Sequence, residues 1–564
     1  MERVREALLE ASIILVVGSL IGGVLAVVSN WFVAGVQFFT QQRETSALFT
    51  LNLGQQSVNF SSLVFLWIAA AAVILIKTAL DIQRWKGPAD SMYAAHQVQE
   101  PLDIKRGFGS TLAAFASASG GASVGQYGPI VHFGATMGIW VKRFISSRLT
   151  HDIYLGCGVA AAISAGFNAP IAGVVFAHEA ILRHFSLRAI APITVAAVAA
   201  SSLSNLWFPQ GATFPIGTAI PSLSEVVPTL AVLSPILAMV AISFMLLLRY
   251  TEKVATQSGI SPLALPFIAA TICGVVGIWI PEVLGLGIAS INEMIAGQFS
   301  LTLLAVVLIA KILMTAICLG CGLFGGVFSP SLFIGVAAGA LAGQLLALFG
   351  FSDIAPVISI AAMAAVSSAV IGAPITAVLI VLELTQSYQY AVAAMAAVML
   401  CGLLTHRLFG HSYFDRQLLD QGIDLHLGRE SIALSQQRVG VFASDDFIAV
   451  DKGTTGNSLQ QQMRAVDHTE AYVVDDSGLL LGKVNIHGAS QCGDSPIIDA
   501  WDTDPIVLYA DESLSVAMQK VSQFVGESLP IIDHRRTMLG SVTEGALFQA
   551  VIDIQTQARN LERN

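Results

Sequence analysis

The chain has 564 residues, of which 55% are hydrophobic and only 12% are charged, and its mean hydropathy is +0.72. This composition excludes an ordinary soluble globular protein and indicates a multi-pass protein of the lipid bilayer with a soluble part attached. The net charge of −10 argues against a nucleic-acid partner, because nucleic-acid binding needs a basic face.

The first apolar run covers residues 13–39 and follows a short leader that contains Arg3 and Arg5. It is too long for the core of a signal peptide, so it predicts an uncleaved, tilted membrane helix. The two arginines predict a cytosolic N-terminus. A second span, residues 63–80, ends at a glycine–proline turn, and residues 107–121 are rich in Ala, Ser and Gly, which predicts close helix packing.

A glycine-rich turn, Gly121 to Pro129, interrupts the apolar sequence and precedes a predicted helix over residues 130–140. At membrane depth, non-helical backbone is tolerated only inside protein or beside a water-filled cavity. The glycines let amides approach a ligand, and the helix that begins at Pro129 directs its positive N-terminal end at the turn. The stretch therefore predicts an anion-binding site.

The same glycine-to-proline step recurs at Gly325 to Pro330, 201 positions later, and Asn168-Ala-Pro recurs 204 positions later as Gly372-Ala-Pro. Near-constant offsets indicate an internal repeat, over residues of about 62–208 and 226–410. Repeats with interrupted helices are typical of transport proteins whose site lies at the midplane. Two converging helix N-termini favour an anion over a cation.

The remaining predicted spans complete the membrane part, and one of them carries Lys311, for which pairing within the protein is favoured over contact with an anion. These spans are residues 155–167, 169–181, 226–248, 263–280, 301–319, 331–348, 355–370, 375–384 and 390–408. After about residue 425 the composition is that of a soluble α/β unit with two similar halves, residues 441–484 and 506–551. The expected domains are therefore residues 1–425 and 426–564.

Three motifs in order resemble the CLC family of chloride channels and transporters: Gly125 to Pro129, Phe167 to Phe176 and Gly325 to Pro330. The tail resembles a divergent pair of CBS modules. The resemblance implies an all-α polytopic membrane fold with inverted repeats and broken helices, followed by a small cytosolic α/β domain. It also implies a homodimer in a bacterial-type plasma membrane, with both termini cytosolic.

The resemblance further implies a chloride site formed by residues at the two turns and at two other places along the chain. Lys86 stands where the family has a serine that faces the ion, although a position at the membrane edge is an equal alternative. Phe414, with Tyr413 beside it, stands where the family has a tyrosine ligand. The expected anion-binding and gating residues are Lys86, Gly125, Tyr127, Gly128, Gly326, Val327, Phe328, Tyr413 and Phe414.

Family exchangers carry protons on two glutamates, and the matching positions here are Tyr127 and Ala180. A phenol with a pKa near 10 is a poor proton carrier at neutral pH, so passive chloride permeation is expected. The alternative is an anion/proton exchanger, or a transporter of another small anion such as nitrate or bicarbonate. A cation transporter or sensor would need intramembrane acidic clusters that the sequence lacks, and no catalytic constellation supports an enzyme.

In CBS modules that bind adenine nucleotides, an aspartate commonly holds the ribose. The matching positions are Gly488 and Ala546, so nucleotide binding is doubtful and a structural role in the dimer is expected. No cofactor is expected, and chloride is the expected transported ion.

Overall fold

The computed structural model describes residues 2–46, 49–53, 56–97, 102–145, 149–209, 222–351 and 353–563. The chain divides into two compact units. The first comprises Met1–Ala95 and Glu100–Ile423, and the second comprises Asp424–Asn564 with the short segment His96–Gln99.

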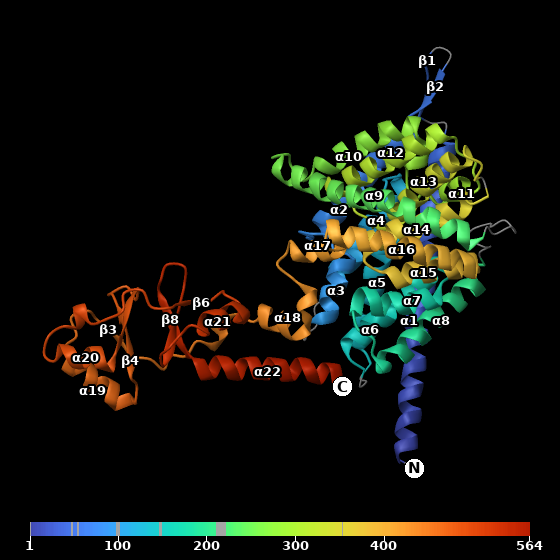
Figure 1. The fold of residues 1–564 in the computed structure, drawn as a ribbon. Helices are drawn as coiled ribbons and strands as arrows, with labels where there is room; N and C mark the ends of the chain where they lie inside the picture. Colours follow the sequence, from blue (N-terminus) through green and yellow to red (C-terminus); the bar gives the residue numbers. More distant parts are fainter. Residues whose placement is uncertain are drawn as a thin grey trace. The chain divides into compact units, whose positions relative to one another are not determined.

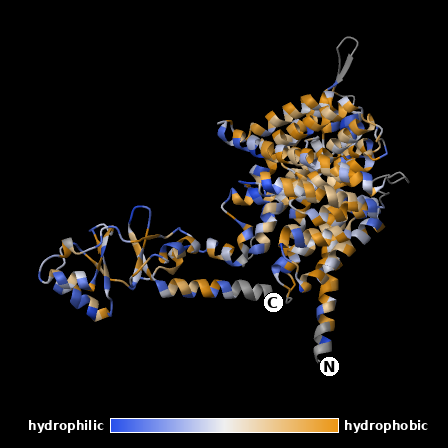
Figure 2. Cartoon of the chain, in the orientation of Figure 1, coloured by the Kyte–Doolittle hydropathy of each residue, from blue (hydrophilic) through white to orange (hydrophobic). Residues whose placement is uncertain are grey.

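The first unit is almost entirely helical, apart from a hairpin of β1 (Thr50–Leu53) and β2 (Gln56–Asn59) (Figure 1). Seven helices among its described residues are long and apolar enough to cross a membrane. Apolar residues dominate the helices of this unit in Figure 2. The protein is an integral, multi-pass membrane protein, and the predicted all-α membrane fold with a small α/β unit is confirmed.

The helices fall into two successive sets of corresponding order. The first set is α1 (Glu2–Thr45), α2 (Ser61–Ala79), α3 (Pro88–His96), α4 (Ile104–Gly120), α5 (Tyr127–Lys142), α6 (His151–Phe167), α7 (Pro170–Phe176) with a π-helical extension (Ala177–Leu182), and α8 (Leu187–Trp207). The second is α9 (Leu223–Gln257), α10 (Leu265–Trp279), α11 (Ile288–Ile295), α12 (Leu301–Gly320), α13 (Phe328–Ala347), α14 (Ala355–Ile371), α15 (Pro374–Thr385) and α16 (Tyr388–Leu408). Helix α17 (Tyr413–Leu419) follows.

Helix packing repeats between the two sets. In the first set α1 packs on α8, α5 on α6, and α2 on α4. The corresponding pairs in the second set are α9 on α16, α13 on α14, and α10 on α12. The long helix α1 therefore corresponds to α9, and the first repeat begins with α1 rather than near residue 62. The sequence offsets did not reveal this, because α1 shares no turn motif with α9.

Small residues allow these helices to approach closely. A Cβ on Gly158 would stand 1.8 Å from the carbonyl oxygen of Gly134, and one on Gly335 would stand 2.7 Å from that of Ala362. Glycine–backbone contacts thus join α5 to α6 in the first repeat and α13 to α14 in the second. Such contacts hold the two helices that begin at the glycine-rich turns in fixed positions.

A glutamate in each repeat caps the N-terminus of a helix in the other repeat. Glu179 accepts hydrogen bonds from the amides of Ile375 and Thr376, both at 2.8 Å, at the start of α15. Glu383 accepts from the amides of Ile171 and Ala172, at 2.9 and 2.7 Å, at the start of α7. Carboxylates at helix N-termini satisfy free amides and complement the helix dipole, so each repeat stabilises a helix of the other.

We expect the Glu383→Ala variant to lose about 1–3 kcal/mol of stability, because the buried amide of Ala172 loses its acceptor. Thermal unfolding of the purified full-length protein in detergent would measure the loss. Glu293→Ala, which removes an exposed carboxylate of α11, serves as the matched control. Equal melting temperatures for the two variants would contradict the capping role.

The second unit contains two sheets of the same topology. In each, the first strand is parallel to the second, and the second is antiparallel to the third with a register shift in that pairing. The strands of the first sheet are β3 (Ala449–Val450), β4 (Glu470–Val474) and β5 (Leu480–Asn485), and those of the second are β6 (Leu508–Tyr509), β7 (Ser528–Ile532) and β8 (Met538–Thr543). This pair of similar halves fits the expected CBS-like arrangement.

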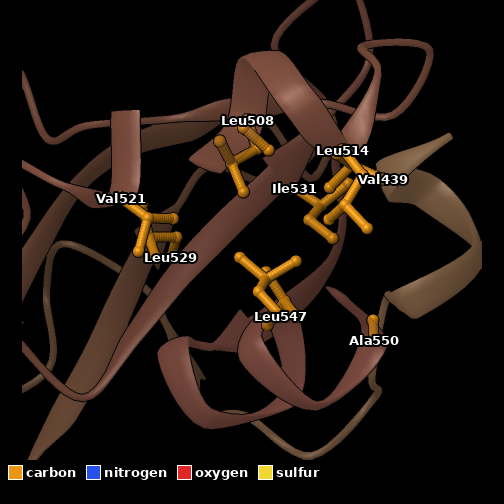
Figure 3. Close-up of a cluster of buried hydrophobic side chains, with 10 residues drawn as sticks. Val439, Leu508, Leu514, Val521, Leu529, Ile531, Leu547 and Ala550 are labelled. Carbon is orange, nitrogen blue, oxygen red and sulfur yellow. The ribbon is translucent and has the colours of Figure 1, made fainter. Parts of the chain in front are cut away.

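Each half surrounds its own apolar core. The second core gathers Leu508, Leu529 and Ile531 from the sheet with Leu514 and Leu547 from helices α21 (Leu514–Val521) and α22 (Glu544–Arg563) (Figure 3). The first core is built alike on helices α19 (Gly456–Val466) and α20 (Ile486–Cys492). The unit also contains the short helix α18 (Gly428–Gln436) and the 3-10 turns Leu425–Leu427, Val439–Phe442 and Ile497–Asp499.

The two halves meet at polar contacts around His468. Its Nδ1 lies 3.0 Å from Glu527 Oε1, and its Nε2 lies 3.2 Å from Asp446 Oδ1. The hydrogen bond with Glu527 raises the pKa of His468, with Asp446 adding to the increase and partial burial opposing it. Protonated His468 therefore stabilises the contact between the halves.

This contact predicts a pH dependence. Because the folded-state pKa lies above the unfolded value of about 6.5, its stabilisation is complete below that pH and is lost as pH rises through the folded-state pKa. Hydrogen exchange of β4 in the full-length protein, corrected for intrinsic rates, should therefore show less protection at pH 8 than at pH 6. The His468→Gln variant should lose this difference, whereas His487→Gln, which changes an exposed histidine, should keep it.

Candidate functional site

The two glycine-rich turns are bonded directly to each other. The amide of Gly125 donates to the carbonyl oxygen of Gly326 at 2.7 Å, and the amide of Gly326 donates to that of Gly125 at 2.6 Å. A Cβ on Gly125 would stand 2.7 Å from the Gly326 oxygen, so only glycine allows this approach. The reciprocal pair places the N-termini of α5 and α13 next to each other, as the sequence predicted.

Several amides at this meeting point have no protein acceptor. Among the described residues, the backbone N–H groups of Gly128, Val327 and Phe328 donate to no hydrogen-bond acceptor. Gly128 and Phe328 belong to the first turns of α5 and α13, whose amides point out of the helix, and Val327 is the N-cap of α13. Free amides and two positive helix ends suit a small anion.

Tyr127 is fixed by a cluster of aromatic rings. Its ring stacks on Phe167 with a centroid distance of 3.8 Å and meets Phe328 edge-on at 5.5 Å. Its hydroxyl donates to the carbonyl oxygen of Gly166 at 3.3 Å. In this conformation the Tyr127 hydroxyl is therefore bonded to a backbone oxygen.

Two cavities approach the turns, and the Tyr127 ring lines only one of them. The first, called the Tyr127 cavity, has a volume of about 420 Å³. It is lined by Asn30, Val33, Ala34, Gln37, Gln126, Tyr127, Ala165, Gly166, Phe167, Phe208, Pro209, Leu286, Ile288, Ile291, Ser329, Leu332, Met363 and Leu384. Apart from Tyr127, no described residue of this lining carries an ionisable side chain.

The second, called the Tyr413 cavity, has a volume of about 180 Å³ and includes backbone of the second turn, Gly325 to Val327. Its other lining residues are Arg84, Trp85, Gly87, Pro88, Asp90, Pro129, Leu248, Glu252, Leu319, Gly320, Phe324, Tyr413, Phe414 and Gln417. No described residue lines both cavities. The paired turns therefore have one cavity beside Tyr127 and another beside Val327.

Residues 68–406 match the family model described as voltage gated chloride channel. The chain belongs to this family, the CLC family. A CLC relative from Ralstonia nicotianae, described as a putative chloride channel protein ClcB-like, is 29% identical over 346 residues, which are 59% of this chain and 79% of that protein. The voltage-gated ClC-type chloride channel ClcB of Escherichia coli O9:H4 is 24% identical over 351 residues, 62% of this chain and 84% of that protein.

Solved CLC structures share the fold. A slow cyanobacterial Cl⁻/H⁺ antiporter aligns with a TM-score of 0.63 and 21% identity over 73% of this chain and 99% of that chain. A eukaryotic CLC transporter aligns with a TM-score of 0.61 and 15% identity over 94% of this chain and 97% of that chain. These similarities establish the CLC fold and leave channel and exchanger activity to be distinguished.

Lys86, which was expected at the position of the family's ion-facing serine, lines neither of the two cavities. Its Nζ donates to Asp90 Oδ1 at 2.8 Å, and Arg84 contacts the same oxygen. The other oxygen of Asp90 accepts from the amide of Gly87 at 3.0 Å. Lys86 is therefore paired, and its neighbours Arg84 and Asp90 are among the residues that line the Tyr413 cavity.

Tyr413 and Phe414, the two residues considered for the last CLC motif, both line the Tyr413 cavity and are both buried. The Tyr413 hydroxyl lies 3.4 Å from Nε2 of Gln417. Buried Asp415, next in the chain, forms an ion pair with Arg183 and accepts from Ser412 at 2.8 Å. These bonds fix α17 against the first repeat.

Sequence reasoning missed two carboxylates of the Tyr413 cavity, Asp90 and Glu252. Asp90 follows the Lys86 turn at helical spacing, a signal that could have suggested the ion pair. Glu252 lies near the end of the long helix α9, and no local motif marks it. Lys311 is buried and donates to the carbonyl oxygens of Val283 and Gly285, at 2.9 and 3.1 Å, so its predicted role in pairing holds.

Proposed function

We propose that this protein conducts chloride passively between the Tyr127 cavity and the Tyr413 cavity, by way of the paired turns. The observation that carries the proposal is the meeting of two helix N-termini whose amides, at Gly128, Val327 and Phe328, lack protein acceptors. These amides would replace part of the hydration shell of the ion, and Tyr127 would be the gate.

The lining of the Tyr127 cavity favours permeation without tight proton coupling. Among its described residues it offers no carboxylate. We infer that Tyr127 stands where family exchangers carry a glutamate. A phenol loses its proton only near pH 10 in water, so it does not exchange protons readily under physiological conditions. A proton entering from this side would therefore have no side chain to carry it to the turns.

A second candidate function is anion/proton exchange. Asp90 and Glu252 line the Tyr413 cavity and could accept protons there. The structural similarity to a slow Cl⁻/H⁺ antiporter is compatible with this alternative. Exchange would require a route for the proton past the turns, which Tyr127 does not supply.

Reconstituted full-length protein separates the two functions. In liposomes with a chloride gradient, a valinomycin-clamped voltage and a pH probe, we expect chloride flux without uphill proton movement. Stoichiometric proton transport driven by the chloride gradient would contradict passive conduction and favour exchange. Competition with nitrate and bicarbonate in the same assay would identify the preferred anion.

Three further features belong to this proposal. We infer a homodimer with one conduction route per subunit, in a bacterial-type plasma membrane with both termini cytosolic. We also infer that the CBS-like unit stabilises the dimer and does not sense nucleotides, since Gly488 and Ala546 supply no ribose-binding carboxylate.

Removing the Asp90 carboxylate should increase the positive charge at the Tyr413 cavity. In the Asp90→Asn variant, Lys86 and Arg84 would lose their shared counter-ion, so we expect the chloride concentration for half-maximal flux to fall by about fivefold. Lys86→Gln should shift it in the opposite direction. Flux measured over a series of chloride concentrations in liposomes gives both shifts. An unchanged half-maximal concentration in Asp90→Asn would show that the ion pairs of Asp90 with Lys86 and Arg84 have no influence on ion entry.

A further inference from the structure

A third cavity of about 380 Å³ adjoins the route. It lies between the end of α1 and the start of α11, and Arg43, Glu44, Glu282 and Ser290 contribute to its wall. It shares Gln37, Leu286 and Ile288 with the Tyr127 cavity. An ion in this space, called the Arg43 cavity, would therefore be next to the route proposed above.

Arg43 is buried without adequate compensation. Its side chain is 4% exposed, and its Nη1 is occluded and has no hydrogen-bond partner among the described residues. Within the described part of the chain its one ion pair is with Glu44, at 3.5 Å, and the Glu44 side chain is 64% exposed. Burying a charged group is costly unless its N–H groups are hydrogen-bonded, so Nη1 of Arg43 lacks an acceptor that an anion could supply.

The N-terminus of α11 faces the same space. Gly287 precedes the helix with a φ of 70°, and no side chain caps it. The amides of Ile288, Ala289 and Ser290, which line the cavity, have no acceptor among the described residues. The ammonium of Lys311 lies 3.7 Å from the point where a Cβ on Gly287 would stand, so a second buried cation adds positive potential behind this turn.

The cavity also contains carboxylates. Glu44 and Glu282 belong to its wall, and Oε2 of Glu282 is occluded without a partner. Neither carboxylate is hydrogen-bonded to Nη1 of Arg43. We propose that the Arg43 cavity binds a small monovalent anion, held by the Arg43 guanidinium and the α11 amides, while Glu282 weakens the binding so that the ion can leave towards the Tyr127 cavity.

Crystals of the full-length protein in sodium bromide test the binding step independently of transport. We expect anomalous bromide density beside Arg43 in the unmodified protein, no such density in Arg43→Gln, and stronger density in Glu282→Gln. Arg43→Lys, which keeps the charge, should retain the peak. The absence of bromide from this cavity in the unmodified protein at a saturating concentration would overturn the proposal.

A second experiment, which measures transport, rests on the proposed function. In liposomes, Arg43→Gln should raise the half-saturating chloride concentration by about tenfold, Glu282→Gln should lower it, and Arg106→Gln, which removes an exposed arginine of α4, should leave it unchanged. If the unmodified protein and the Arg43 and Glu282 variants all conduct chloride with the same half-saturating concentration, the Arg43 site is wrong and the proposed conduction route stands. If none conducts chloride, the proposed function fails, whatever the bromide density beside Arg43. Should Arg43→Gln not fold, Glu282→Gln, which leaves Arg43 in place, still decides the proposal.

Discussion

Replacing Tyr127 by alanine should raise the rate of chloride flux by about tenfold or more, since removal of 1.4 kcal/mol from a barrier corresponds to that factor. Tyr127 lines the Tyr127 cavity and is 9% exposed, and its ring stacks on Phe167 and meets Phe328 edge-on. Alanine would remove the ring and leave the glycine-rich turn in place. Initial rates of chloride efflux from liposomes of equal protein content measure the change.

Two variants separate the ring from its hydroxyl. Tyr127→Phe keeps the stacking on Phe167 and loses only the bond to Gly166, so its flux should stay close to that of the unmodified protein. Tyr127→Glu would place a carboxylate in a cavity that has none among its described residues, so its flux should be slow at neutral pH and rise as the pH falls. An unchanged flux in Tyr127→Ala would remove Tyr127 from the route.

The Gly125→Val variant should abolish chloride flux. A side chain at this position would begin 2.7 Å from the Gly326 oxygen, 2.8 Å from Cδ of Pro330 and 3.0 Å from the amide nitrogen of Ser329, all in the opposite repeat. No flexible neighbour can move aside, so the two reciprocal hydrogen bonds would break and the free amides would separate. Flux should fall to that of empty liposomes.

A matched control is available within the same unit. Gly402 lies in α16, and a Cβ there would meet nothing within 4 Å, so Gly402→Ala should conduct normally. Size-exclusion elution and thermal unfolding would show whether Gly125→Val still folds. A folded Gly125→Val protein with full flux would mean that the ion does not pass beside the paired turns.

Most of the fold could be predicted from the motifs that recur in the two halves of the sequence. Gly125 and Gly326 were recognisable because a glycine-to-proline step before an apolar helix has few uses at membrane depth. Glu179 and Glu383 are also 204 positions apart in the sequence, and the helix cap that each gives to the other repeat explains this spacing. Such features are readable because each depends on local backbone geometry repeated in two places.

Other parts of the site depend on contacts between distant segments, which local patterns do not encode. The Tyr127 hydroxyl is bonded to Gly166, and Glu252 reaches the Tyr413 cavity from the end of a long helix. Nη1 of Arg43 is buried because α1 packs on α4, α6 and α8, although the sequence neighbourhood of Arg43 resembles an ordinary polar helix end. Side-chain partners of this kind are known only once the helices are packed.

The most direct test of the central claim is the position of a bound anion at the paired turns. Anomalous diffraction from crystals of the unmodified full-length protein in sodium bromide would locate it. We expect a bromide ion beside the amides of Gly128, Val327 and Phe328, between the first turns of α5 and α13. Absence of bromide from this position, with the two turns still bonded to each other, would contradict the account.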